Sequence, residues 1–430
     1  MKKYFPLFWV FYLLCAFSAH AGEGRYTIPL TGGGWSLWLD KEASWQNDRL
    51  YLPHEITDLS LLPVNVPTGG WQTLSHNPDA VPVEVPGTVE EYLTVTDNPR
   101  PENFRGVSWW YRKITIPADQ QKKRFIIYFE SVRMRAEVYL DGKLVAYDLI
   151  GETPFHVDIT DEAKPGKEQL LAIRVTNPGG NFHWQDFDIM KWGEYNIPPS
   201  RSFTGIIGRV KLESVNPVFI SDIYMQNTPE LTKVNAILSF TNETSSSVKQ
   251  DVELIVNEKG NPDKVVFRQT LKAISFPAGN HEVTIPVNVP DAKLWDLSTP
   301  ELYTCNVLIK KGKKMLDQDK KDFGFRWFTV DGVGKDAVLR LNGRRIMLRS
   351  AISWGYFPVT GLIATTEMAE KQVRTAKSLG LNMLNFHRCI GSPVVLEKAD
   401  ELGLLYYEEP GSFHSANHDP FIRTIVNEKL

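Results

Sequence analysis

The chain has 430 residues, of which 42% are hydrophobic and 23% are charged. At ~150 residues per domain this length predicts roughly three domains, and the composition excludes both a wholly disordered chain and a polytopic membrane protein. The 48 Lys and Arg residues nearly balance the 51 Asp and Glu residues, so the net charge is −3. Without a strong basic field, nucleic acid is not expected as a partner.

Residues 1–21 have the pattern of a secretory signal peptide. A short basic start is followed by an apolar run over 5–17 and by Ala19-His20-Ala21, a small-residue cleavage site. A lipid anchor through Cys15 is the weaker alternative, because a bulky residue precedes that cysteine. We therefore expect cleavage before Gly22, no integral membrane span in the mature chain, and a periplasmic, secreted or cell-surface location.

Two cysteines, Cys305 and Cys389, remain after that cleavage. They are far apart in the sequence, so we expect two buried thiols rather than a disulfide framework. A catalytic cysteine would need a base and an orienting partner, and no spacing in this sequence supports one.

Residues 22–216 consist of short alternating runs separated by turns, with no long segment of helical period. Asp141-Gly142, between two of these runs, is a strong hairpin signal. The pattern predicts an all-β sandwich or jelly roll. The expected strands are 125–130, 136–140, 143–147, 170–175 and 210–215.

Residues 217–326 form a second all-β region. Its polar and glycine-containing turns separate runs with the period of a strand. The strand count and length fit an immunoglobulin-like β-sandwich. The expected strands are 234–240, 249–256, 281–287 and 302–309.

The pattern changes in residues 327–430, where strands and helices alternate. Strands are expected at 345–351, 381–386 and 404–407, and helices at 366–379, 393–402 and from 420 onward. The helix starts are marked by Thr365 or Thr366, by Ser392-Pro393 and by Asp419-Pro420, and Gly380 and Gly403 mark two ends. Alternation of this kind predicts a parallel sheet.

Three strands and about 100 residues do not close a (β/α)₈ barrel, which needs ~250 residues. The sequence leaves two interpretations: a small open sheet, or a barrel of which only the beginning is present. We favour the second, a truncated barrel.

Short motifs in all three regions occur in a characteristic order. They are 85–88, 106–112 and 205–209 in the first region, 294–303 and 323–326 in the second, and 341–349, 380–382 and 399–405 in the third. Together these motifs resemble glycoside hydrolase family 2. The resemblance implies a multidomain fold made of a sugar-binding jelly roll (22–216), an immunoglobulin-like sandwich (217–326) and the start of a catalytic TIM barrel (327–430).

Members of that family are retaining β-glycosidases, which implies a carbohydrate substrate. Retention needs two carboxyl groups ~5–5.5 Å apart, and in the family both are Glu residues on later barrel strands, expected beyond Leu430. No catalytic residue is therefore assigned, and the chain alone is expected to be inactive. Asn427-Glu428 resembles the family's Asn-Glu pair in composition, but it sits in a helical pattern and is read as a solvated helix face.

The resemblance implies sugar contacts from two loops. Trp354 and Tyr356 follow the first barrel strand, where barrel active sites form, and both sugar stacking and ordinary loop packing remain open for them. Residues 181–188 lie where the family reaches a jelly-roll loop toward the barrel. There Asp186 or Asp188 is a candidate hydroxyl acceptor, with a turn-ordering role as the alternative.

His387 and Arg388 immediately follow the second barrel strand, and Glu409 ends the third, where it matches a family position. Because the carboxyl ends of barrel strands face the active site, we expect these three residues to line the sugar pocket of a complete enzyme. Arg388 can donate a fork of hydrogen bonds to sugar hydroxyls or to a uronate carboxylate, and Glu409 can orient it. The alternative is a structural ion pair that braces two loops.

The sequence departs from the family after the second strand. The family often has Arg followed three residues later by His, and these places hold Asn385 and Arg388. Ser350 stands where Gly is common. These differences leave the sugar and any metal site open, and no cofactor is expected. A non-catalytic carbohydrate-binding protein and a structural cell-surface module remain the competing hypotheses.

Overall fold

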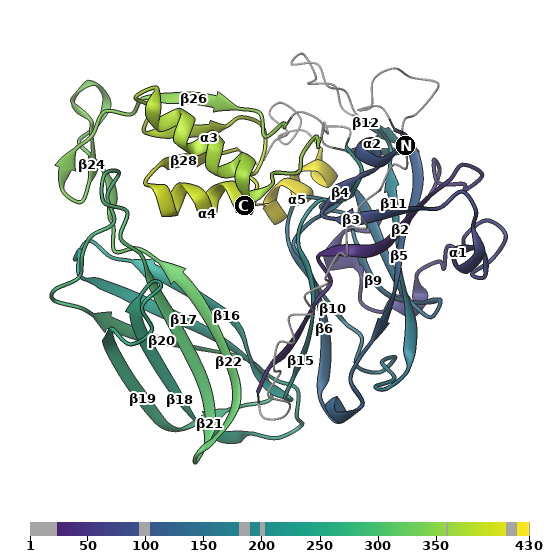
Figure 1. Ribbon diagram of the computed structural model, residues 1–430, viewed down its shortest axis with the longest axis horizontal. Coiled ribbons are helices and arrows are strands. Elements are labelled where there is room, and N and C mark those ends of the chain that lie inside the picture. The colour runs from purple at the N-terminus through teal and green to yellow at the C-terminus, as the bar shows by residue number, and fades with distance from the viewer. Residues whose placement is uncertain are drawn as a thin grey trace, which may run out of the picture.

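The computed structural model describes residues 24–93, 104–179, 190–197, 203–357, 360–409 and 419–429. Figure 1 shows three parts: a large β-sandwich built from the N-terminal strands, a second β-sandwich, and a smaller part that contains the longer helices. We call them the first sandwich, the second sandwich and the α/β part. The mostly-β, multidomain architecture that the sequence predicts is therefore present.

The first sandwich packs a six-stranded antiparallel sheet, in the order β3-β2-β5-β11-β8-β9, on a four-stranded one, in the order β1-β15-β6-β10. Its strands alternate inward and outward residues, as in β6, where Phe125, Ile127 and Phe129 are buried between the sheets. The bounds are β1 Tyr26–Pro29, β2 Gly32–Asp40, β3 Val81–Val85, β5 Gly106–Thr115, β6 Arg124–Phe129, β8 Arg135–Leu140, β9 Lys143–Asp148, β10 Phe155–Asp158, β11 Glu168–Asn177 and β15 Val210–Val215.

Short elements surround these two sheets. They are β4 Gly87–Thr88, β7 Val132–Arg133, β12 Met190–Trp192, β13 Tyr195–Ile197, β14 Gly205–Ile206, α1 Thr73–His76 and α2 Val89–Tyr92. The predicted hairpin turn joins β8 to β9, with both Asp141 (φ 49°) and Gly142 (φ 83°) in the left-handed region that such turns require.

The six-stranded sheet is buried on both faces. Trp110 points into the core between the two sheets, whereas its neighbour Trp109 belongs to a second apolar cluster on the opposite face. That second cluster also contains Trp45 and Trp192, from segments that lie over the sheet, and Ile425 from near the C-terminus.

The second sandwich packs a sheet of order β16-β17-β20 on one of order β19-β18-β21-β22. Its core consists of aliphatic and aromatic side chains, among them Leu238, Leu254 and Phe276. The bounds are β16 Val218–Asn227, β17 Lys233–Asn242, β18 Val248–Glu258, β19 Val265–Phe276, β20 Gly279–Asn288, β21 Tyr303–Lys311 and β22 Lys314–Phe323.

The α/β part begins with a small antiparallel sheet and continues with a parallel sheet of order β26-β27-β28. Leu384 and Phe386 of β27 pack in one cluster with residues of α3 and α4. On the opposite face, Ile352 and Tyr407 are 55% and 56% exposed. The bounds are β23 Phe328–Asp331, β24 Val338–Leu341, β25 Arg344–Arg345, β26 Ser350–Ser353, α3 Thr366–Ser378, β27 Met383–Phe386, α4 Pro393–Leu402, β28 Leu405–Glu408 and α5 Pro420–Lys429.

The strand expected at 345–351 is wrong in its position. Asn382 holds residues 347–349 with its side chain: Nδ2 donates to the Met347 carbonyl (2.9 Å) and Oδ1 accepts from the Arg349 backbone N–H (2.7 Å). The chain therefore pairs antiparallel at Arg344–Arg345 and enters the parallel sheet only at Ser350.

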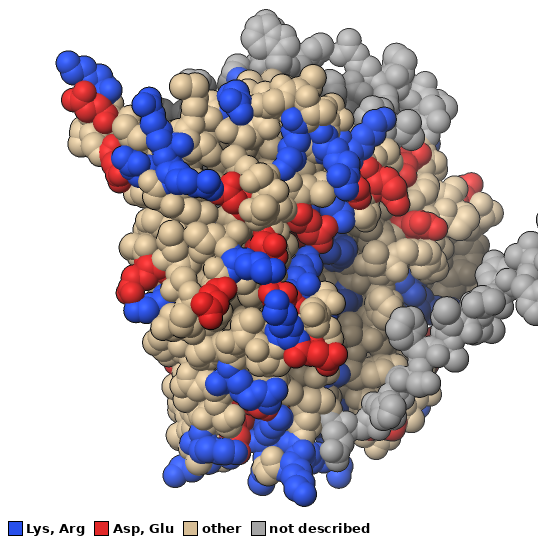
Figure 2. All heavy atoms as spheres, turned by 60° about the vertical axis from the view of Figure 1, so that its left-hand side comes forward, with Lys and Arg blue, Asp and Glu red and all other residues tan. Residues whose placement is uncertain are grey.

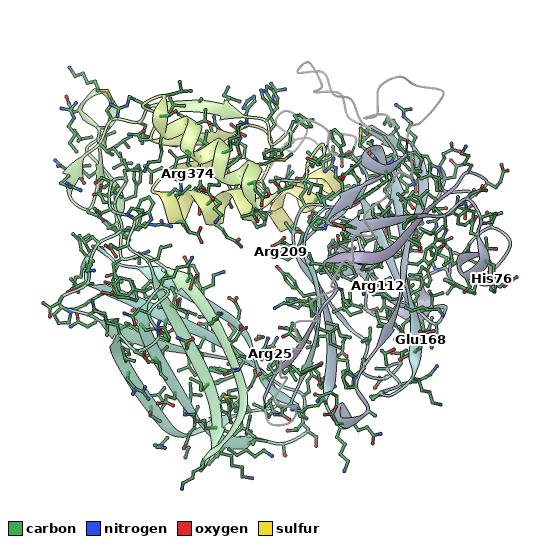
Figure 3. All side chains as sticks on the ribbon, in the orientation of Figure 1. Arg25, His76, Arg112, Glu168, Arg209 and Arg374 are labelled. Atoms are coloured by element: carbon green, nitrogen blue, oxygen red, sulfur yellow. The ribbon has the colours of Figure 1, made fainter. Side chains whose placement is uncertain are left out.

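Ion pairs attach α4 to both sandwiches. Arg209 of the first sandwich lies 2.6 Å from Glu130 of the same sandwich and 2.6 Å from Glu397 of α4. Lys259 of the second sandwich lies 2.9 Å from Glu401 of α4. Figure 3 shows Arg209 on the side of the first sandwich that faces the α/β part.

A buried ion pair joins the two sandwiches near the N-terminal end of the described chain. Arg25 contacts Asp317 of β22 through two nitrogens (3.0 and 3.2 Å) and Glu213 of β15 (3.0 Å). Asp317 also accepts from the Ile220 backbone N–H at 2.7 Å. Figure 3 shows Arg25 between the two sandwiches.

Helix α5 packs on the first sandwich rather than on the parallel sheet. Ile425 enters the outer cluster of that sandwich, Phe421 contacts the Tyr195 ring (5.1 Å between centroids), and the Asn196 amide donates to Asp419 at 2.9 Å. Asp419 caps the helix by accepting from the Phe421 backbone N–H. The apolar face of α5 is therefore buried against another part of the molecule.

Three general expectations can be compared with this fold. Cys305 and Cys389 are buried free thiols, as predicted. In the middle of the face shown in Figure 2, acidic and basic side chains lie interspersed, in keeping with the balanced composition. Within the described ranges, no helix combines the length and the apolar character that a membrane crossing requires.

Candidate functional site

The carboxyl ends of β26, β27 and β28 lie side by side because the three strands are parallel and in register. Ile352, Asn385 and Tyr407 occupy one row across the sheet. Two positions further along, just past each strand end, come Trp354, His387 and Glu409; the His387 ring contacts Trp354 and its Nδ1 contacts Glu409. With Arg388, these three residues form what we call the strand-end site.

Glu409 is the centre of the site's polar contacts. Its Oε1 lies 3.1 Å from His387 Nδ1, and its Oε2 accepts from the Arg388 backbone N–H at 3.0 Å. The two side chains are partly accessible, at 20% for His387 and 17% for Glu409. A carboxylate with two such partners fixes the start of the loop that follows β27.

Trp354 closes the opposite side of the site. The His387 ring meets it edge to face, with 4.8 Å between centroids. The Arg388 guanidinium carbon lies 5.5 Å from the Trp354 ring centroid, in cation–π range. An indole, an imidazole and a guanidinium thus lie together at one sheet edge.

Arg388 has a left-handed backbone, with φ 62°. This conformation is uncommon for a residue with a side chain and costs free energy. The Glu409 carboxylate holds it by accepting from the Arg388 N–H. Sequence reasoning did not identify this feature, because arginine carries no local signal for it.

Ser353 supports the site from below. Its carbonyl accepts from the His387 N–H (3.0 Å), and its hydroxyl accepts from the Gln372 amide (3.0 Å) and the Gly355 N–H (3.3 Å). Neither Ser353 nor Gln372 was expected to take part, since their contact depends on α3 packing over β26.

Glu408 turns to the other face of β28, opposite to Glu409. It pairs in register with Phe386, whose side chain is in the cluster under the helices. Its Oε1 accepts from the Gly391 backbone N–H at 2.7 Å. Burial raises the pKa of the Glu408 carboxyl above its usual range.

The structure brings four of the five predicted binding residues together: Trp354, His387, Arg388 and Glu409. The fifth, Asp186, and its alternative Asp188 lie outside the described residues. Tyr356 is close to the strand-end site in sequence, and its ring contacts Phe203 of the first sandwich (5.7 Å between centroids).

The pair Asn427-Glu428 lies in the last turns of α5, and both residues are exposed there, as the helical pattern predicts. Among the described residues, no group of three or more His, Cys, Asp or Glu side chains is placed to hold a metal ion. The strand-end site offers instead hydrogen-bond donors, one carboxylate and an aromatic face, a set that can bind a polar organic ligand.

A separate cleft of about 820 Å³ opens where the three parts meet. Cys389, Ile390 and Gly391 line it on one side, and Arg209 and Glu397 line it on another. The four strand-end residues are absent from its described walls. The loop after β27 therefore contributes to the strand-end site with its first residues and to the cleft with its last ones.

Comparison with known families gives two matches. Residues 33–196 match the family described as "Glycosyl hydrolases family 2, sugar binding domain", and residues 218–326 match the family described as "Glycosyl hydrolases family 2".

Curated relatives match over most of this chain. A beta-glucuronidase of Formosa agariphila is 24% identical over 70% of this chain and 32% of its own length, and a putative beta-glucuronidase of the same organism is 26% identical over 89% and 43%. A beta-galactosidase of Thermoanaerobacterium thermosulfurigenes is 28% identical over 71% and 41%. The chain thus spans less than half the length of these relatives.

Solved structures show the same fold. A beta-glucuronidase from glycoside hydrolase family 2 superposes with a TM-score of 0.69 at 19% identity, covering 95% of this chain and 42% of that one. A beta-galacturonidase from Eisenbergiella tayi gives a TM-score of 0.69 at 18% identity, covering 94% and 62%.

Proposed function

Because the chain belongs to the glycosyl hydrolases of family 2, we propose that the full-length protein is a glycoside hydrolase that cleaves terminal β-glycosidic bonds with retention of configuration. The observation that carries the proposal is the strand-end site. There an indole, a guanidinium and a carboxylate from three neighbouring parallel strands meet at one sheet edge. Such a set can stack on a sugar ring and bind its hydroxyls.

We propose that β26–β28 are the first strands of a TIM barrel. The parallel order and the helices packed on one face support this. So does the opposite face, where Ile352 and Tyr407 are more than half exposed. In a closed barrel such residues fill the interior.

The proposed mechanism needs two carboxyl groups ~5–5.5 Å apart. At the described strand ends Glu409 faces Trp354 and His387, whereas Glu408 faces the helix side. We therefore propose that the acid/base and nucleophile Glu residues are not among those of this chain, and that the chain alone hydrolyses no glycoside. Glu409 and Arg388 then bind and orient the sugar.

Two sugars are the first candidates for the substrate. The curated relatives are named beta-glucuronidases and beta-galactosidases. The fork of donors on Arg388 suits either a uronate carboxylate or vicinal hydroxyls.

We also propose export through residues 1–21, which lie outside the described residues. N-terminal sequencing of the exported protein should begin at Gly22, and an intact Met1 would contradict export.

The test is calorimetric titration of the chain with phenyl β-D-glucuronide and phenyl β-D-galactoside. We expect one of them to bind, and Arg388→Ala or Glu409→Gln to weaken binding about ten-fold or more, roughly 1.4 kcal/mol. Arg374→Ala is the matched control, since Arg374 is exposed on α3 and its ion pair is with Glu370 of the same helix.

Three outcomes would count against the proposal. Unchanged binding in both site variants, with a lowered melting temperature, would make the contacts a structural brace of two loops. Turnover of aryl β-glycosides by the chain, lost in Glu428→Gln, would restore the Asn427-Glu428 pair to a catalytic role. Binding of glycans without hydrolysis by any longer form of the protein would favour a carbohydrate-binding protein.

A further inference from the structure

The loop 387–391 is held by two consecutive carboxylates of the neighbouring strand. Glu409 accepts from the N–H of Arg388 at 3.0 Å, and Glu408 accepts from the N–H of Gly391 at 2.7 Å. Because successive side chains of a strand point to opposite faces, the two carboxylates bind the loop from opposite faces of the sheet. The loop carries His387 and Arg388 at one end and joins α4 at the other.

The contact of Glu408 depends on a close approach that only glycine permits. A Cβ on Gly391 would lie 2.8 Å from atoms of the Phe386 ring and 3.0 Å from Glu408 Oε1. No real Cβ atom takes the first of these distances without displacement of its neighbour. The backbone of Gly391 is thus fitted between Phe386 and the Glu408 carboxylate.

Holding this loop with a carboxylate costs free energy, because the charged group must be partly removed from water. Glu408 is half-buried and its described contacts contain a single hydrogen bond, so burial raises its pKa. A raised pKa means that the ionised side chain is disfavoured in the folded protein, and an apolar residue of the same size would not carry this cost. The cost is understandable if Glu408 serves the geometry of the loop rather than the stability of the fold.

We infer that Glu408 is a positioning residue, which fixes the loop 387–391 and through it the side chains of His387 and Arg388 in the strand-end site. It acts on the Gly391 amide and does not touch the sugar. Its partner in this role is Glu409, which touches both the loop and the site. The part of the inference that concerns sugar binding rests on the proposed function.

Three variants of the full chain test the inference. Glu408→Gln keeps an acceptor oxygen for the Gly391 N–H, Glu408→Met keeps the length of the side chain and removes the acceptor, and Gly391→Ala displaces the loop from the other side. Glu370→Met on α3 is the matched control, because Glu370 is an exposed glutamate whose ion pair is local to its helix.

Two measurements are made on each variant. Hydrogen exchange followed by mass spectrometry reports the protection of the peptide that contains 384–392, and calorimetry reports binding of phenyl β-D-glucuronide and phenyl β-D-galactoside. We expect Glu408→Met and Gly391→Ala to exchange faster in this peptide and to bind at least about five-fold more weakly. Glu408→Gln and Glu370→Met should resemble the parent chain in both measurements.

The two arms separate failure of the inference from failure of the proposed function. If exchange in the peptide is unchanged in Glu408→Met and Gly391→Ala, the positioning role is wrong, whatever the sugars do. If the parent chain binds neither glycoside, the proposed sugar site fails, and the exchange data alone then decide whether Glu408 holds the loop. If Glu408→Gln loosens the loop as much as Glu408→Met, the acceptor oxygen is not the cause and the inference is overturned.

Discussion

The left-handed backbone of Arg388 leads to a prediction in which a glycine stabilises the protein. We compare Arg388→Gly with Arg388→Ala, which both remove the guanidinium and its contact with Trp354. The two variants then differ only in the Cβ atom at a position with φ 62°. The difference in their free energies of unfolding therefore reports the backbone strain together with the greater freedom of glycine in the unfolded chain.

The expected size of the difference follows from two opposing effects. A residue with a Cβ loses about 1–2 kcal/mol in the left-handed region. Glycine avoids that loss, but its greater conformational freedom in the unfolded chain lowers the free energy of unfolding by about 0.5–1 kcal/mol. Arg388→Gly should therefore be more stable than Arg388→Ala by about 1 kcal/mol.

The assay is urea unfolding followed by far-UV circular dichroism in the helical band, because the longer described helices lie in the α/β part. The same pair of substitutions at Arg374, in the middle of α3, is the control. There the order should reverse, with Ala more stable than Gly by about 1 kcal/mol. An Arg388→Ala variant as stable as Arg388→Gly would refute the reasoning, since the loop would then relax freely once the guanidinium is gone.

Further predictions concern the buried charges and one glycine. Arg25→Ala should lower the free energy of unfolding by about 3–5 kcal/mol at neutral pH, because it leaves the fully buried Asp317 carboxylate without its guanidinium. Burial already raises the pKa of Asp317, so the loss should shrink as the pH falls and that carboxyl takes up a proton; an equal loss in acid and neutral urea titrations would contradict this. Burial, with a smaller effect of the Glu428 charge, raises the pKa of Asp148 to about 6. Because its pKa is raised in the folded protein, ionisation of Asp148 lowers the free energy of unfolding as the pH rises through about 4 to 6. Asp148→Asn should therefore stabilise the protein by about 1–3 kcal/mol near pH 8 and by little near pH 4. The shift in melting temperature at the two pH values measures this. Gly403→Ala should destabilise α4 by more than about 1 kcal/mol, because the residue has φ 77° and its Cβ would lie 2.5 Å from the Leu297 carbonyl oxygen; unchanged urea midpoints would show that this junction yields easily.

Local sequence signals predicted the parts of this fold that local physics decides. Thr365 caps α3 through the Met368 N–H, Gly403 ends α4 in the left-handed conformation, and Asp141-Gly142 turns the β8–β9 hairpin. Each of these residues satisfies a backbone requirement within a few positions of itself.

The misplaced strand shows where such signals stop. Residues 346–349 are apolar enough to be read as a strand, yet Met347 is 69% exposed and its carbonyl is bound by the side chain of Asn382. That partner lies 35 residues away, so no local pattern could reveal it.

The candidate site likewise has features that the sequence predicted and features that it did not. Strand ends in a parallel sheet meet at one edge, and this rule was sufficient to bring Trp354, His387 and Glu409 together from the sequence. The opposite roles of Glu408 and Glu409 were not predicted, because the sequence shows two adjacent glutamates and the distinction arises from which face of β28 each occupies.

The packing of α5 on the first sandwich has a consequence for the order in which the protein folds. Asn196 and Asp419, which join at the edge of that contact, are 223 residues apart in the chain. At ~5–20 residues per second a ribosome needs roughly 10–45 s to synthesise that interval. Throughout it, the outer apolar cluster of the first sandwich is without Ile425. The first sandwich therefore obtains its complete outer cluster only after the second sandwich and β26–β28 have been synthesised.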